Sequence, residues 1–139
     1  MEEKDVVIPR GITKEEIKIR ESIIKDYYVR WIIEHPDKKI WNDSLGDYIH
    51  VKFISINETY NKAARRYEST LAVFRLTEVM AKAVLQQEKP TKPGDKNQKS
   101  FGKLLIMIHD GIKLTVGVQK SNQDKVQYCV TAIGSITNK

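Results

Sequence analysis

The chain has little of what most often marks a disulfide framework, a metal site or a cofactor site. Its 139 residues include one cysteine, Cys129, so no intrachain disulfide can form and no thiolate cluster can hold a structural zinc. The three histidines fit no HExxH pattern, and there is neither a phosphate-cradling glycine loop nor a GxSxG elbow. We therefore expect no metal and no cofactor.

Long apolar runs are also missing. No stretch approaches the ~18 apolar residues that span a bilayer. The charged beginning, MEEKDVVIPRG, lacks the apolar core of a signal peptide. These two features predict a cytoplasmic protein that does not contact a membrane.

The residues that are present suit one compact domain. A hydrophobic content of 40% over this length predicts a single domain covering residues 1–139, with flexible segments at residues 1–12 and 88–100. The segment 88–100, EKPTKPGDKNQKS, has no large apolar residue, as is typical of a mobile loop. Twenty-four Lys and Arg against eighteen Asp and Glu give a net charge of +6, which favours anionic partners such as nucleic acid.

Helices are predicted in the first two thirds of the chain. Thr13 and Glu16 form a capping-box pattern, and apolar residues then recur every three or four positions, so a helix is expected over residues 14–34. Its aromatic residues could offer a base-stacking surface, but aromatics at this spacing are typical of a core. Ser55 and Glu58 form a second capping box that opens two or three short helices over residues 57–87, with breaks near residues 68–70 and 77.

Strands dominate the last third. Asp110-Gly111 between two apolar runs predicts a type I′ hairpin, and the chain should end in an antiparallel meander of residues 103–109, 112–119 and 125–133. The alternating stretch 47–56 predicts a half-buried strand, a plausible fourth near residues 48–54. The predicted fold class is α+β, with N-terminal helices packed on one face of a C-terminal antiparallel sheet of about four strands.

One face of the last hairpin is predicted to be polar. A five-residue loop centred on Asn122 would pair Gln119 with Lys125 and Lys113 with Thr131. The face would then carry Lys113, Thr115, Gly117, Gln119, Lys125, Gln127, Cys129 and Thr131. Two interpretations remain open: the solvated back of a half-exposed sheet, or a floor on which RNA is held.

Other candidate residues lie upstream. Lys62, Arg65 and Arg66 have helical spacing and could grip an RNA backbone, although a solvated helix edge would have the same pattern. His50 lies on the same alternation as Lys52 and could act as a general acid or base if its side of the strand lines the cleft.

The sequence also resembles a known group of proteins. The run ARRYESTLAVFRL (residues 64–76), followed by KLTVGV (113–118) and VQYCVTAI (126–133), resembles bacterial proteins from mobile elements and phage-like regions. These are in turn similar to the barnase/EndoU/colicin/RelE-like (BECR) nuclease superfamily. The resemblance covers most of residues 20–134 and implies helices before a curved antiparallel sheet whose concave face holds RNA. It points to a strand pair carrying Lys113, Thr115, Tyr128 and Thr131 and a helix carrying Lys62, Arg65 and Arg66.

Together these patterns predict an RNA-binding domain of a mobile element that could be a metal-independent endoribonuclease or toxin-like domain. The alternative is a non-catalytic binding or regulatory module on the same scaffold. The candidate catalytic residues are His50, Lys62, Thr115 and Thr131, and the candidate RNA-binding residues are Arg65, Arg66, Lys113 and Gln127. RNA is the expected partner, an antitoxin-like or other protein partner is the second, and the oligomeric state stays open.

Overall fold

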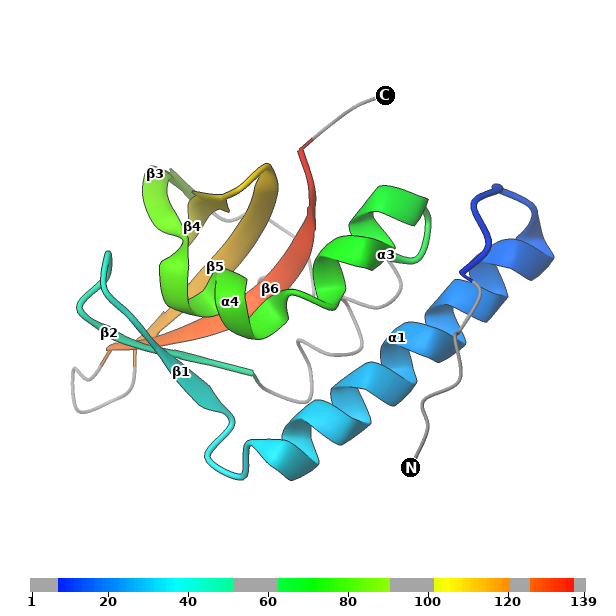
Figure 1. Ribbon diagram of the computed structural model, residues 1–139. Helices are drawn as coiled ribbons and strands as arrows, with labels where there is room; N and C mark the ends of the chain where they lie inside the picture. Colours follow the sequence, from blue (N-terminus) through cyan, green and yellow to red (C-terminus); the bar gives the residue numbers. More distant parts are fainter. Residues whose placement is uncertain (1–7, 52–62, 91–101, 121–125, 137–139) are drawn as a thin grey trace.

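The computed structural model describes residues 8–51, 63–90, 102–120 and 126–136 (Figure 1). In these ranges the helices are α1 (Lys14–Glu34), α3 (Tyr67–Val73) and α4 (Leu76–Lys82). The strands are β1 (Lys39–Asn42), β2 (Asp47–His50), β3 (Val84–Pro90), β4 (Lys103–His109), β5 (Ile112–Lys120) and β6 (Val126–Ser135). No helix within the described ranges combines the length and the apolar character needed to cross a bilayer.

The strands form one sheet in the order β1-β2-β6-β5-β4-β3. Four of its neighbouring pairs are antiparallel, whereas β2 and β6 run parallel and pair Ile49 with Tyr128 and His50 with Cys129. The α+β class with mostly N-terminal helices is thus confirmed. The prediction of a purely antiparallel sheet of about four strands is wrong, because β1 and β3 extend it and β2 joins it in the parallel direction.

Helix α1 begins and ends where its sequence predicts. The Thr13 hydroxyl accepts a hydrogen bond from the Glu16 N–H at 3.2 Å, and the Glu16 carboxylate accepts one from the Thr13 N–H at 3.4 Å. At the other end the His35 N–H donates to the Trp31 carbonyl at 2.9 Å, one residue before Pro36. The predicted helix over residues 14–34 is confirmed.

The helices form two layers on one face of the sheet. Helix α3 packs against β6, and α4 packs against β1, β4 and β5. Helix α1 lies outside α3 (Figure 1). Its Trp31 indole N–H donates to the Thr77 hydroxyl of α4 at 2.8 Å, and the centres of the Tyr27 and Phe74 rings are 5.2 Å apart. Tyr28 and Trp31 are buried, so the aromatics of α1 belong to the core, as expected from their spacing.

Two parts of the predicted element order need correction. The helical region was expected to reach residue 87, but α4 ends at Lys82 and the next residues form the edge strand β3, with Val84 opposite Ile108. A side chain from β1 helps end the helix, since the buried Asn42 amide donates to the carbonyls of Met80 at 2.8 Å and Ala83 at 3.0 Å. Residues 39–42, for which no helix or strand was predicted, form β1.

Other predictions meet the described residues only in part. Helices α3 and α4 begin within a few residues of the expected breaks, and β2 covers the first residues of the strand expected over 47–56. The first residues of the expected loop 88–100 belong to β3. Val51 is described and follows β2 without belonging to it, whereas residues 52–56 and 91–100 and the second capping box, Ser55 and Glu58, lie outside the described residues.

The two C-terminal hairpins differ in how well they were predicted. Asp110 and Gly111 have φ of 51° and 74°, as the type I′ turn requires, and His109 lies opposite Ile112. In the second hairpin Gln119 pairs with Gln127, not with Lys125. This register shifts the pairing by two residues, and a bulge between Thr115 and Val116 adds one more, so that Lys113 lies opposite Gly134 instead of Thr131.

Candidate functional site: the polar face of the sheet

The side of the sheet away from α3 and α4 gathers most of the predicted site residues. Paired residues project to the same side of a sheet, and alternate residues along a strand do so as well. We call this side the polar face; its residues on β1, β2, β5 and β6 are Lys39, Trp41, Tyr48, His50, Lys113, Thr115, Gly117, Gln119, Gln127, Cys129, Ala132 and Gly134, with Thr131 at the bulge beside Ala132. On the opposite side Leu114, Val116 and Ile133 are buried in the core.

The predicted sidedness is confirmed although the predicted register is wrong. The observed pairing of Gln119 with Gln127 differs from the expected one by two residues, which is one full period of a strand, so the side chains of β5 and those of β6 up to the bulge keep their side. Thr131 lies at the bulge, and Lys125 lies outside the described residues. Exposure along the polar face is uneven. Lys113 is exposed, Thr115, Gln119 and Gln127 are half-buried, and Cys129 is buried.

The candidate catalytic residues in the described ranges lie on neighbouring strands. The Thr131 hydroxyl, at the bulge of β6, donates to the Thr115 carbonyl of β5 at 3.2 Å. His50 of β2 lies beside Cys129, two positions before Thr131 along β6, and faces Lys39 of β1. The fold therefore brings His50, Thr115 and Thr131 to one part of the polar face. Lys62 lies outside the described residues.

The candidate phosphate-binding cations gather at the C-terminal end of β6. Lys113 lies opposite Gly134, and the Arg66 guanidinium donates to the carbonyl of Ser135 at 3.5 Å. Arg65 is exposed in the turn before α3. Arg66 is thus near the same end of the sheet as Lys113.

Tyr128, implied by the resemblance to belong to the site, lies on the other side. It pairs with Val118 and packs, half-buried, against the hydrophobic core. The register therefore makes it a core residue.

Three residues of the first hairpin join the polar face without having been predicted. Lys39, Trp41 and Tyr48, which we call the aromatic corner, lie on β1 and β2 at the edge of the sheet. Trp41 is 47% exposed and Tyr48 is 39% exposed. The sequence signal is the alternation of Lys39 and Trp41 with Ile40 and Asn42, but four residues are too few to separate a strand from a loop.

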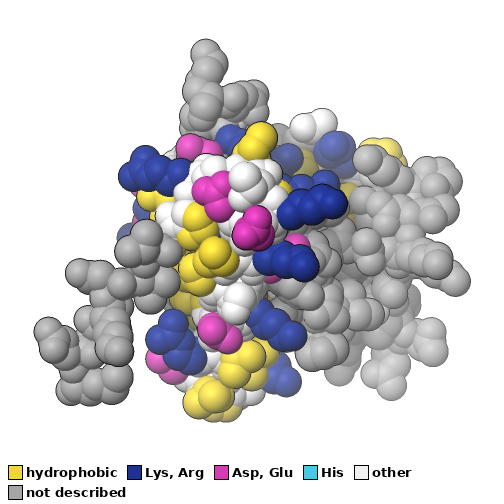
Figure 2. Space-filling model, turned by 90° about the vertical axis from the view of Figure 1, so that its right-hand side faces the viewer, with side chains coloured by type: hydrophobic (Ala, Val, Ile, Leu, Met, Phe, Trp, Pro, Cys, Tyr) yellow, Lys and Arg dark blue, Asp and Glu magenta, His cyan; other side chains and the backbone are white. Residues whose placement is uncertain are grey.

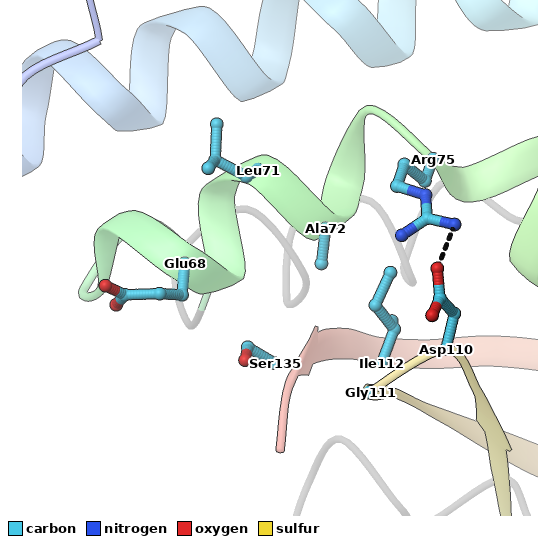
Figure 3. A pocket seen from close by; sticks show the side chains of 8 residues that line it. All are labelled: Glu68, Leu71, Ala72, Arg75, Asp110, Gly111, Ile112 and Ser135. Atoms are coloured by element: carbon cyan, nitrogen blue, oxygen red, sulfur yellow. Dashed lines mark hydrogen bonds and ion pairs between the residues drawn. The ribbon is translucent and has the colours of Figure 1, made fainter. Parts of the chain in front are cut away.

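A second candidate site lies between α3 and the tip of the β4–β5 hairpin. It is a pocket of about 320 Å³, lined by Glu68, Leu71, Ala72, Arg75, Asp110, Gly111, Ile112 and Ser135. Figure 3 shows Arg75 at one end, joined to Asp110, and Glu68 at the other, with apolar side chains between them. At this size the pocket suits at most a small molecule or a single side chain.

Ionic contacts tie the hairpin tip to α4 beside this pocket. Arg75 Nη2 lies 2.6 Å from Glu78 Oε2 and 2.8 Å from Asp110 Oδ2, and His109 Nε2 lies 2.7 Å from Glu78 Oε2. The Arg75 guanidinium, helped by His109, lowers the pKa of Glu78 to about 2. Hydrogen bonds to Glu78 and then Asp110 raise the pKa of Arg75. Because Arg75 is already neutralised by two carboxylates, it is a poor anion-binding group.

Two further features give no site. Figure 2 looks at the side of the molecule where α1 begins and shows that, among the residues the structure describes there, apolar side chains are interspersed with charges of both signs. No three His, Cys, Asp or Glu side chains of the described ranges are grouped so that they could hold a metal ion.

The comparisons with known proteins place the chain in a family. The model of the large polyvalent protein-associated domain 3 matches residues 20–128. The chain belongs to this family. Polyvalent proteins occur in mobile elements. The predicted resemblance to proteins of mobile elements is therefore confirmed. No curated protein and no solved structure matches the chain. The link to the BECR superfamily stays a prediction.

Proposed function

We propose that this large polyvalent protein-associated domain 3 binds single-stranded RNA across its polar face. The observation that carries the proposal is the composition of the sheet side opposite α3 and α4. It has exposed aromatic rings and Lys39 at one edge, exposed Lys113 at the other end, and half-buried amides and hydroxyls between them. Aromatic rings stack on unpaired bases, lysines attract phosphates, and amides bond base edges. If this side were only the solvated back of the sheet, the polar groups would be sufficient and the exposed aromatic rings would have no role.

The dimensions of the polar face suit a short strand. From Trp41 on β1 to Lys113 on β5 the sheet order spans three strand spacings, roughly 14 Å, and Gln119 to Lys113 adds roughly 20 Å along β5. The diagonal of roughly 25 Å that these spacings give is compatible with a few nucleotides, the site size of small single-strand-binding sheets.

Cleavage requires more functional groups than binding does. An endoribonuclease of this kind needs an acid, a base and cations over the scissile phosphate. His50 is the described residue of the polar face best suited to proton transfer, and it lies between Lys39 and Cys129. The second candidate, Lys62, is outside the described residues. We therefore propose RNA binding as the function and keep acid–base cleavage by His50 and Lys62 as a prediction that the same experiment tests.

Fluorescence anisotropy with a labelled, unstructured 12-nucleotide RNA measures binding over a series of salt concentrations. If Lys113 contacts a phosphate, Lys113→Ala should weaken binding and reduce the salt slope by about 0.7. Lys18→Ala, which removes an exposed lysine of α1, is the matched control and should leave both unchanged. Gel analysis of the same RNA in EDTA at pH 5 to 8 detects cleavage, which should disappear in His50→Ala.

Failure of the wild-type protein to bind RNA, or equal effects of Lys113→Ala and Lys18→Ala, would overturn the proposal. Binding without cleavage would establish a non-catalytic module.

A further inference from the structure

We propose that the aromatic corner is a stacking site for an unpaired base, with Trp41 as the residue that receives it. This inference rests on the proposed RNA binding and adds the position at which a base, as opposed to the backbone, is recognised. The sequence alone did not predict these residues as a site, and the family match does not indicate them.

The geometry holds both rings in place while leaving them accessible. The Trp41 and Tyr48 rings meet edge to face, with centroids 5.2 Å apart and planes at 81°. The Trp41 indole N–H donates to Asp43 Oδ1 at 2.8 Å, and Lys39 Nζ lies 4.4 Å from the centre of the Tyr48 ring. The polar end of the indole is thus already satisfied, and what remains exposed is ring surface.

The second tryptophan, Trp31, has a structural role and differs from Trp41 in its burial. Trp31 is 2% exposed, bonds Thr77 and stacks on His35 at 4.3 Å. Trp41 is 47% exposed at the edge of the sheet, on the side opposite to α3 and α4. A preset ring of this kind loses little conformational freedom when a flat ligand stacks on it.

The neighbours of Trp41 define which ligand fits. Lys39 can contact a phosphate beside the stacked base, and Gln127, level with Tyr48 in the sheet, offers an amide for a base edge. Asp43 and Asp47 lie at the turn between the strands, where Asp47 accepts from the Tyr48 N–H at 2.7 Å. These carboxylates repel phosphate, so the backbone of the strand should run on the side of Lys39 and Lys113.

Tryptophan fluorescence tests the inference directly, because the chain has two tryptophans and one of them is buried. Oligoadenylate should quench the emission of the wild-type protein, whereas an abasic ribose-phosphate oligomer of equal length should not. Trp41→Phe removes the exposed reporter, so quenching should vanish while most of the affinity remains.

Trp41→Ala should weaken oligoadenylate binding about 5- to 140-fold, the equivalent of ~1–3 kcal/mol per stacked base. Its affinity for the abasic oligomer should not change, and circular dichroism checks that it is folded. Equal affinities of wild type and Trp41→Ala for oligoadenylate would overturn this inference and leave the proposed RNA binding intact. If the wild type binds no RNA but free adenosine monophosphate still quenches Trp41, the stacking site stands and the extended polar-face function fails.

Discussion

Arg20 offers the sharpest test of how α1 is joined to the rest of the molecule. Its side chain is 0% exposed and bonds backbone carbonyls only: Nε to Ala64 at 2.7 Å, Nη1 to Pro9 at 2.7 Å and Nη2 to Arg65 at 3.4 Å. The guanidinium thereby joins the segment before α1 and the turn before α3 to the middle of the helix. Replacing it by methionine keeps much of the volume and removes these bonds.

The expected cost follows from the bond geometry. Two short hydrogen bonds from a charged donor contribute about 1.5–3 kcal/mol each, and the bond at 3.4 Å contributes little. Removing a buried guanidinium also relieves its desolvation, which offsets several kcal/mol of this loss. We therefore expect Arg20→Met to lower the free energy of unfolding by about 2 kcal/mol. For a chain of 139 residues this corresponds to a fall in melting temperature of about 8 °C.

Thermal and urea unfolding followed by circular dichroism measure this change. Arg20→Lys should lose most of the same stability, because an ammonium lacks the planar fork that reaches three carbonyls. Arg30→Met, an exposed change on the same helix, should shift the unfolding free energy by less than about 0.5 kcal/mol. A melting temperature of Arg20→Met equal to or above that of the wild type would refute the reasoning, since desolvation would then outweigh the bonds.

Two further predictions concern the sheet edge and the hairpin tip. Asn42→Ala should destabilise the fold by about 3 kcal/mol in urea unfolding, because it leaves two carbonyls at the end of α4 and a loop N–H without their partner. The control, the exposed change Ser44→Ala, should lower the free energy of unfolding by less than about 1 kcal/mol. Equal losses of stability in the two variants would contradict the role of Asn42. Glu78 contributes stability above its ordinary pKa of 4.5 and loses it as the pH falls towards its folded value of about 2. The difference in urea midpoint between wild type and Glu78→Gln should therefore shrink between pH 4.5 and 2, and a constant difference would show that Arg75 and His109 add nothing through this carboxylate.

The parts of the fold that the sequence predicts well are those specified by near neighbours. Thr13 and Glu16 lie three positions apart and satisfy each other's backbone groups, so the start of α1 is visible locally. Asp110 and Gly111 are the two residues that a type I′ turn needs, so β4 and β5 follow from them.

The parts that the sequence does not predict depend on distant partners. Residues 84–87 follow α4, and the sequence around them has no signal that ends a helix. The helix ends because the Asn42 amide, about forty positions earlier, donates to the last carbonyls of α4, and the next residues then pair with β4. The parallel neighbour of β6 cannot be recognised in either strand alone, since pairing direction is a property of the assembled sheet.

The candidate site divides in the same way. The side on which Lys113, Thr115 and Gln127 project follows from the strand period of two and survives an error of two residues in register. The aromatic corner depends on β1, a strand of four residues that only its pairing with β2 reveals. From the sequence alone, Trp41 therefore cannot be distinguished from a loop residue.

The position of β6 has a consequence for how the chain reaches its native state. This strand is the last that the structure describes, yet it lies between β2 and β5, so in the described ranges it supplies the only strand pairing between the β1–β2 hairpin and the other three strands of the sheet. During synthesis on the ribosome, the β1–β2 hairpin (residues 39–50) can pair with the sheet only after β6 (residues 126–135) has been synthesised. Such late, long-range pairing is slow compared with local hairpin closure, and the rate of completing the sheet should be set by this single docking event.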